Sequence, residues 1–362
     1  DCVARDNPYL ATGADCGDVL GRDVAYPPLL YWSFVWTRHI SLSAGALLWA
    51  AVSLVLTLAS LFAWAAARQR DAWTVVFIGL LMLQFPTLFQ LERGNSDVIV
   101  IAAWTIAAYL FSSRRYAGSG AAAAFAAAAK LYPAIACVVV GLGVLGWALR
   151  DQRGRRPLLF FTAGGVLMAT LVLVVFLEQN LRFFLETLPA RAEWVAAPSV
   201  YGHSLEHLAP WGATWVLIVP LVATWSIAAA RLVPRHSPWA FAGALALSTY
   251  VFPSSFDYNL ITAYPLLLLQ FLRVVRASGH RVDAAWLIYL ALLLTGLVAI
   301  VGNRSLFDSS EDMLRLHVLL QFAWLMLSGI VAAIWPTASA ADGSWSGLQA
   351  DSSGDTRERP AT

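Results

Sequence analysis

The sequence predicts an all-α, polytopic integral membrane protein, and three observations support this fold class. Of its 362 residues, 59% are hydrophobic and only 13% are charged, which is too little charge for the surface of a soluble domain of this length. Apolar runs long enough to cross a bilayer alternate with polar loops. Arginines are concentrated in every second loop, as in chains that cross a membrane repeatedly. No basic tract suited to nucleic acid is present.

Residues 1–40 are predicted to be an extracytoplasmic first loop that ends in an interfacial helix. Its first part is polar and rich in Asp, Gly and Pro. The segment PLLYWSFVWTRHIS then supplies Trp and Tyr side chains, which favour the boundary between lipid and water. Cys2 and Cys16 lie in this loop and would either form a disulfide or stay as two free thiols.

Residues 41–335 are predicted to form the transmembrane domain, with about eleven spanning helices. Residues 117–149 are too many for one helix and carry arginines on both flanks, so we expect a hairpin that turns at Lys130 to Pro133. The small residues of its first arm, AAAAFAAAA, would let neighbouring helices approach closely. The expected spans are 41–67, 73–91, 98–111, the two arms of 117–149, 158–177, 212–233, 239–252, 259–272, 284–301 and 313–335.

The charge distribution also predicts the orientation of the chain. The positive-inside rule places the arginine-rich loops in the cytoplasm and the first loop outside. Residues 336–362 then form a cytoplasmic tail, whose Ser, Gly, Asp and Ala content predicts disorder. The sequence begins with Asp and shows no signal peptide, so we expect that a preceding segment was removed or is missing. A twelfth helix in that segment would restore a cytoplasmic start.

Most of the unusual polar residues fall on the predicted outer face. Ionisable groups at membrane depth are costly unless they face protein or water, so they indicate function. Arg93 and Lys130 are predicted to bind a phosphate at the interface, and a loop Asp would accept the proton of an attacking hydroxyl. The residues predicted to contact substrate are Tyr26, Asn95, Asp97, Tyr132, His203, His207, Asp257, Tyr258 and Asn259.

The same residues also have structural explanations, which the sequence leaves open. Arg93 could cap a helix or pair with a neighbouring acid at the lipid headgroups. Lys130 could extend its side chain to the interface, as single lysines near helix ends do. Asp257 could belong to an ordinary turn between helices, and His203 and His207 could be solvated loop residues.

Metal ligands and cofactors are not expected. The motifs CxxC, HExxH and DxD are absent, and the six His are scattered along the chain. The only small molecule that the sequence implies besides an acceptor is a co-substrate that carries a phosphate.

Five segments in chain order resemble glycosyltransferase family 87. The main pair is QLERGNSDVIVIAAWTIAAYLF and, after a basic turn, AAAAFAAAAKLYPAIA. Arg93, Gly94 and Asn95 match the family's first turn, and Lys130 and Pro133 match its K-x-x-P ending. Weaker matches are RDNPYL with AYPPLLYW, then YGHSLEHL, and then SSFDYNLITAYPLLLL. The resemblance extends from about residue 6 to residue 272 and implies a GT-C-like membrane fold.

The resemblance implies a specific activity. The family includes polyprenol-phosphate-mannose-dependent mannosyltransferases, so the resemblance implies transfer of a hexose, often mannose, from a polyprenyl-phosphate donor. The acceptor would be a lipid-linked molecule or a glycan at the extracytoplasmic face of the plasma membrane. Transfer would invert the anomeric carbon, without a metal.

The resemblance also implies an acidic base in the first outer loop. In the family this acid lies well upstream of the NPY-like segment, whereas only Asp1 and Asp6 precede Asn7 here. The expected base is therefore Asp1, Asp6 or an acid upstream of the chain.

Two other classes of function compete with the glycosyltransferase. A transporter or flippase of lipid-linked saccharide would bind a similar substrate, but it predicts ionisable groups at helix centres or inverted repeats, and neither is evident. A structural role in a membrane complex predicts no outer pocket.

Overall fold

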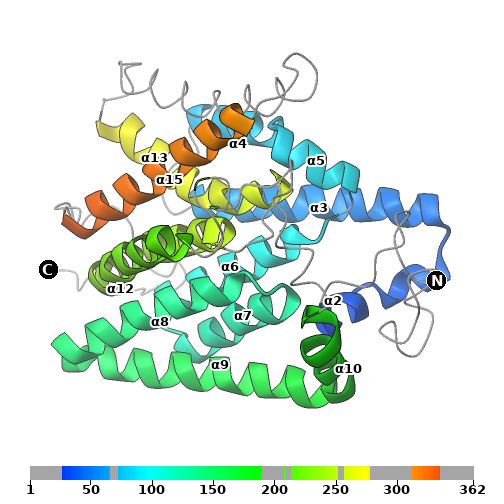
Figure 1. The fold of residues 1–362 in the computed structure, drawn as a ribbon, viewed down its shortest axis with the longest axis horizontal. Helices are drawn as coiled ribbons and strands as arrows, with labels where there is room; N and C mark the ends of the chain where they lie inside the picture. The colour runs from blue at the N-terminus through cyan, green and yellow to red at the C-terminus, as the bar shows by residue number, and fades with distance from the viewer. Residues whose placement is uncertain are drawn as a thin grey trace, which may run out of the picture.

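The computed structural model describes residues 27–65, 72–93, 95–189, 205, 208, 213–251, 257–277 and 311–334. Every regular element in these ranges is helical and none is a strand, which confirms the all-α class (Figure 1). Within the described part of the chain, four helical segments are long and apolar enough to cross a membrane: Ser43–Ala65, Pro133–Arg150, Gln152–Val175 and Trp215–Val251. The chain is therefore a polytopic membrane protein. The total of eleven spans stays a prediction, because the first loop, the span 284–301 and the tail 336–362 lie outside the described residues.

The elements follow one another along the chain as shown in Figure 1. The first are α2 (Pro28–Trp32), η3 (Val35–His39), α3 (Leu42–Ala65), α4 (Ala72–Met82), α5 (Phe85–Arg93), α6 (Asp97–Ser112), α7 (Tyr116–Ala129) and α8 (Pro133–Arg150). The others are η4 (Gln152–Gly154), α9 (Arg155–Val175), α10 (Leu177–Arg182), η5 (Phe183–Thr187), α12 (Trp215–Val251), η8 (Asp257–Ala263), α13 (Tyr264–Ala277) and α15 (Glu311–Ile334).

The single span predicted for 73–91 is wrong, because two short helices occupy this segment. Helix α4 ends at Met82 and α5 begins at Phe85. Pro86 accounts for the break, since its ring would clash with the carbonyl of residue 82 in a continuous helix. The Leu81 carbonyl accepts the backbone N–H of Gln84 at 3.2 Å and the Thr87 hydroxyl at 3.0 Å, and the second bond links the start of α5 to the end of α4.

The hairpin predicted for 117–149 is confirmed. Helix α7 ends at Ala129, and α8 begins at Pro133, which stands at its first position. Lys130 between them has extended backbone angles of −144° and 145°. Proline favours the start of a helix because its φ is already helical and it has no N–H to satisfy.

The Ala-rich arm packs closely on a neighbouring helix, as expected, and this neighbour is α9. A Cβ atom added to Gly120 would lie 1.9 Å from the carbonyl oxygen of Phe161, and one added to Gly164 would lie 1.9 Å from that of Ala117. The two backbones are thus in direct contact, which only small residues allow. In Figure 1, α7 lies between α6 and α9.

Helices are present in both segments predicted to span at 212–233 and 239–252, and they are the two halves of α12. His236 interrupts this element with non-helical angles of −135° and 45°, between Pro234 and Pro238. The halves fold back on each other, because a Cβ atom on Gly243 would lie 1.8 Å from the ring of Trp225. Residues 240–251 of the second half are all buried, so this half forms the centre of the bundle.

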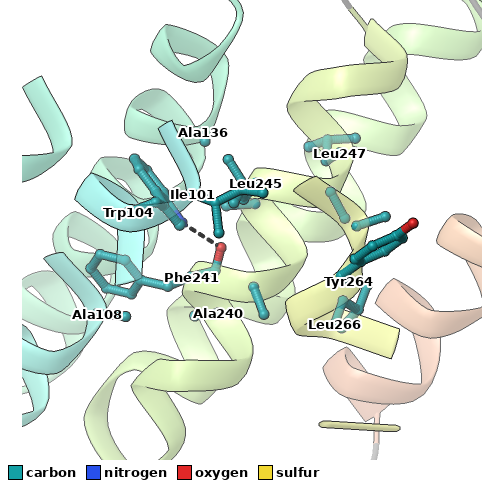
Figure 2. Packing of buried hydrophobic residues seen from close by; sticks show 14 of the residues in the cluster. Ile101, Trp104, Ala108, Ala136, Ala240, Phe241, Leu245, Leu247, Tyr264 and Leu266 are labelled. Atoms are coloured by element: carbon teal, nitrogen blue, oxygen red, sulfur yellow. Dashed lines mark hydrogen bonds between the residues drawn. The ribbon is translucent and has the colours of Figure 1, made fainter. Parts of the chain in front are cut away.

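The core lies where the second half of α12 meets α6 and α13 (Figure 2). Trp104 is completely buried, and its indole N–H donates to the carbonyl of Phe241 at 2.7 Å. The two rings also pack, with centroids 5.5 Å apart. Ile101, Leu245 and Tyr264 belong to the same buried cluster. Phe111 of α6 packs on the same Phe241 ring, with centroids 5.4 Å apart, so these contacts together hold α6 on the central helix.

The close contact inside α12 leads to a stability prediction. Replacing Gly243 with alanine should lower the free energy of unfolding by about 1–3 kcal/mol, because the new methyl group overlaps the Trp225 ring. That ring cannot easily move, since it is buried and its N–H donates to the carbonyl of Leu325 at 3.1 Å. Thermal unfolding of the detergent-solubilised protein measures the effect. The control is Gly141→Ala, where the added methyl group meets nothing within 4 Å and should be neutral or stabilising.

Arginine-rich turns gather at one end of the bundle, as the charge pattern predicted. At the end of α6, the hydroxyls of Ser112 and Ser237 are 2.9 Å apart, which brings the α6–α7 turn beside the break in α12. The Arg150 guanidinium at the end of α8 donates to the carbonyl of Ala230 nearby. Helix α6 has 16 residues, so its other end lies about 24 Å away. We call the arginine-rich end the basic end.

Candidate active site

Three turns that are far apart in the sequence meet at the end of α6 opposite the basic end. Asp97 is the first residue of α6. Lys130 and Tyr132 come from the α7–α8 turn, and Asn259 comes from η8, just before α13. All of these side chains are buried.

Asp97 is the centre of this group and is 0% exposed. Its Oδ1 atom accepts a hydrogen bond from the Lys130 ammonium at 2.8 Å and another from the Tyr132 hydroxyl at 2.7 Å. Its Oδ2 atom accepts a hydrogen bond from the Asn259 amide at 2.8 Å. One carboxylate thus joins α6, the α7–α8 turn and η8.

Lys130 makes a second charge-assisted contact and is only 5% exposed. Its ammonium donates to Asn95 Oδ1 at 2.6 Å, and the same oxygen accepts the backbone N–H of Ser96 at 2.6 Å. We call Asn95, Asp97, Lys130, Tyr132 and Asn259 the Asp97 cluster.

The cluster contains one negative and one positive charge, so as a whole it is neutral. Burial of either charge alone would be costly, and the pair is tolerable because its geometry is close and polar groups surround it. The start of α6 adds to the stabilisation, since the free N–H groups of a helix N-terminus favour a carboxylate there.

Local sequence explains how each member reaches its place. The backbone N–H of Asn95 donates to the carbonyl of Gln90 at 3.1 Å, which closes the turn between α5 and α6. The extended conformation of Lys130 ends α7 and turns the chain towards the start of α8. In η8 the Thr262 hydroxyl donates to the carbonyl of Asn259 at 2.7 Å, so the turn is bound at two points.

Several hydroxyl groups near this end of the bundle were not predicted from the sequence. Thr249 and Thr262 form a hydroxyl pair between α12 and η8. The hydroxyls of Thr87 and Tyr264 are 3.0 Å apart and link α5 to the start of α13. A weak signal existed for Thr262, which lies three residues after Asn259 and therefore on the same face of a 3₁₀ turn. Gln90 is also buried, and its Oε1 atom has no hydrogen-bond partner among the residues that the structure describes.

The structure brings five of the predicted residues together, namely the whole Asp97 cluster. Arg93 ends α5, two residues before Asn95, and Asp257 and Tyr258 begin η8. For these three residues the structure describes the backbone only. The predicted residues outside the described ranges are Asp1, Asp6, Tyr26, His203 and His207. The roles assigned to all these residues therefore stay predictions.

The arrangement itself limits what Asp97 does chemically. Both carboxylate oxygens are engaged by donors from the protein, and the side chain has no exposed surface. In this arrangement the carboxylate is suited to hold other groups in place and not to meet an acceptor hydroxyl. Among the described residues no group of three or more His, Cys, Asp and Glu could hold a metal ion.

Comparison with known protein families gives a match that covers more than half of the chain. The family model of glycosyltransferase family 87 matches residues 25–254. This segment contains both main motifs and every member of the Asp97 cluster except Asn259. No curated protein and no solved structure gives a significant match.

Proposed function

Because the chain belongs to glycosyltransferase family 87, we propose that it transfers a hexose, with mannose as the expected sugar, from a polyprenyl-phosphate carrier. The acceptor is a lipid-linked molecule or a glycan, and transfer takes place at the extracytoplasmic face of the membrane. No cofactor takes part, and the carrier-linked sugar is the co-substrate.

The observation that supports this proposal is the position of the Asp97 cluster. It lies within a bundle of apolar helices at the end away from the arginine-rich turns, and four of its five members belong to the family match. Burial of ionisable residues in a membrane protein is costly in free energy, so such a group of residues indicates a functional site. A site at one end of the bundle suits a substrate whose lipid tail stays in the bilayer while its sugar and phosphate remain at the surface.

The chemistry follows from this arrangement. The acceptor hydroxyl attacks the anomeric carbon, and the bond between that carbon and the carrier phosphate breaks. The carrier phosphate leaves with the electron pair, and a carboxylate takes the hydroxyl proton. That base is Asp1, Asp6 or an acid upstream of the chain. The anomeric configuration is inverted, because attack and departure occur on opposite faces of the sugar.

The test is direct transfer by the purified protein in lipid nanodiscs. Polyprenyl phosphate that carries radiolabelled mannose, and separately labelled glucose, is supplied with a lipid extract as acceptor. The expected result is movement of the label from the carrier to the acceptor. Label that crosses the bilayer of a proteoliposome while it stays on its carrier would instead support a transporter, and no transfer with any donor would contradict the proposal.

The leaving phosphate needs a cation, and Arg93 is the proposed one. Its position next to the Asp97 cluster and the planar fork of its guanidinium suit a phosphate at the interface. The Arg93→Gln variant should raise the KM for the donor about 10- to 100-fold, the loss of one charge-assisted contact. Arg153→Gln is the matched control, because Arg153 is exposed at the basic end. An equal change in both variants would contradict this role.

A further inference from the structure

We propose that Lys130 is a positioning residue that neutralises Asp97 and does not contact the donor phosphate. This inference rests on the proposed function and changes the role that the sequence predicted for Lys130. In this role, the ion pair fixes the positions of the α7–α8 turn and of η8 relative to the start of α6.

The contacts of the ammonium support this assignment. Lys130 Nζ lies 2.8 Å from Asp97 Oδ1 and 2.6 Å from Asn95 Oδ1, and both partners are buried. A phosphate could replace the carboxylate only by leaving Asp97 charged and buried without its cation, which is strongly unfavourable. Lys130 is also only 5% exposed, so a donor phosphate would have to move buried groups aside in order to reach the ammonium.

The presence of lysine and not arginine at position 130 also supports a positioning role. Lys130 is the only lysine in the 362 residues, and every other cationic side chain is arginine. Arginine is the better group for a phosphate, because its fork binds two oxygens at once, whereas an ammonium is a compact point charge. A compact charge suits the space between Asn95 and Asp97, where the side chain is 5% exposed.

Loss of the Lys130 ammonium should also affect η8, because Asn259 of η8 donates to the Asp97 carboxylate. Tyr132 and Asn259 both donate to Asp97, so the orientation of this carboxylate sets two turns at once. Element η8 also contains Asp257 and Tyr258, which the sequence predicts to contact substrate. Loss of the ammonium should therefore disturb the chemical step more than the binding of the donor.

A double-mutant cycle in the full chain separates the two roles. The variants are Lys130→Met, Asp97→Asn and the combination, all reconstituted in nanodiscs. Lys130→Met should lower kcat about 10- to 100-fold with little change in the KM for the donor. The double variant should recover most of the lost kcat, because neither charge of the buried pair remains. The Asn259 amide can turn over to pair with an asparagine at position 97.

The opposite pattern would overturn the inference. If Lys130 holds the donor phosphate, Lys130→Met raises the KM for the donor, and the double variant is no better than the single one. Thermal unfolding of the same four proteins provides a readout without substrate. The double variant should be more stable than either single variant, and additive losses would contradict the pairing.

The single lysine allows a second test that needs no transfer activity. An amine-reactive acetylating reagent, followed by peptide mass spectrometry, reports on Lys130 and the terminal amine alone. Lys130 should resist acetylation equally with and without polyprenyl phosphate, and Asp97→Asn should make it more reactive. Reactivity that polyprenyl phosphate suppresses in the unmodified protein would overturn the inference. Failure of the transfer assay would reject the proposed function and leave this test intact.

Discussion

Replacement of Trp104 with alanine is expected to cost about 3–5 kcal/mol of folding free energy, the range for a large aromatic side chain removed from a core. Trp104 is 0% exposed and packs on Phe241 of the central helix. Its indole N–H donates to the carbonyl of Phe241 (Figure 2). The variant therefore leaves a cavity in the interior and removes a buried hydrogen bond.

The measurement for Trp104→Ala is thermal or denaturant unfolding in detergent. Trp215→Ala is the matched control, because Trp215 is 61% exposed and its loss should change stability by about 0.5 kcal/mol or less. Trp104→Phe should recover part of the loss, since it keeps aromatic packing but not the hydrogen bond. Similar melting temperatures for Trp104→Ala and Trp215→Ala would show that α6 is not held on the central helix in this way.

The second large effect is expected for Asp97→Ala, which removes the centre of the Asp97 cluster. The Lys130 ammonium loses its counter-ion, and Tyr132 and Asn259 lose their common acceptor. Loss of one partner of a buried ion pair costs about 3–5 kcal/mol. We therefore expect a much less stable protein with little or no sugar transfer.

Asp151→Ala is the control for this variant. Asp151 is exposed at the basic end, where its carboxylate accepts the backbone N–H of Arg153 at 2.9 Å. Loss of such a capping contact costs about 0.5–2 kcal/mol and should leave sugar transfer unchanged. Asp97→Ala with normal stability and normal transfer would mean that the cluster serves neither folding nor function.

The sequence predicted most helices that the structure describes, because lipid imposes a simple rule on composition and length. The hairpin of α7 and α8 followed from arginines on both flanks of one long apolar run. The segment 73–91 shows where that rule is not sufficient. It is apolar enough for one span, yet Pro86 divides it, and a local backbone clash outweighs the average hydropathy.

The members of the candidate site were predictable, but their partners were not. Polar residues at the ends of apolar runs are few, so Asn95, Asp97, Lys130, Tyr132 and Asn259 were identified by their scarcity. Lys130 and Asp97 are separated by 33 positions, and Asn259 and Asp97 by 162. No local pattern specifies which of these groups meet.

The sequence by itself determined that this chain is a helical membrane protein of the glycosyltransferase family 87 type, with its scarce polar residues at helix ends. The reason is that burial in lipid depends on composition and on the length of each run. Only the tertiary structure decided that Lys130 and Asp97 neutralise each other and that Asn259 completes the group. These contacts depend on how helices pack side by side, and a buried charge takes as its partner whatever group that packing brings within hydrogen-bond distance.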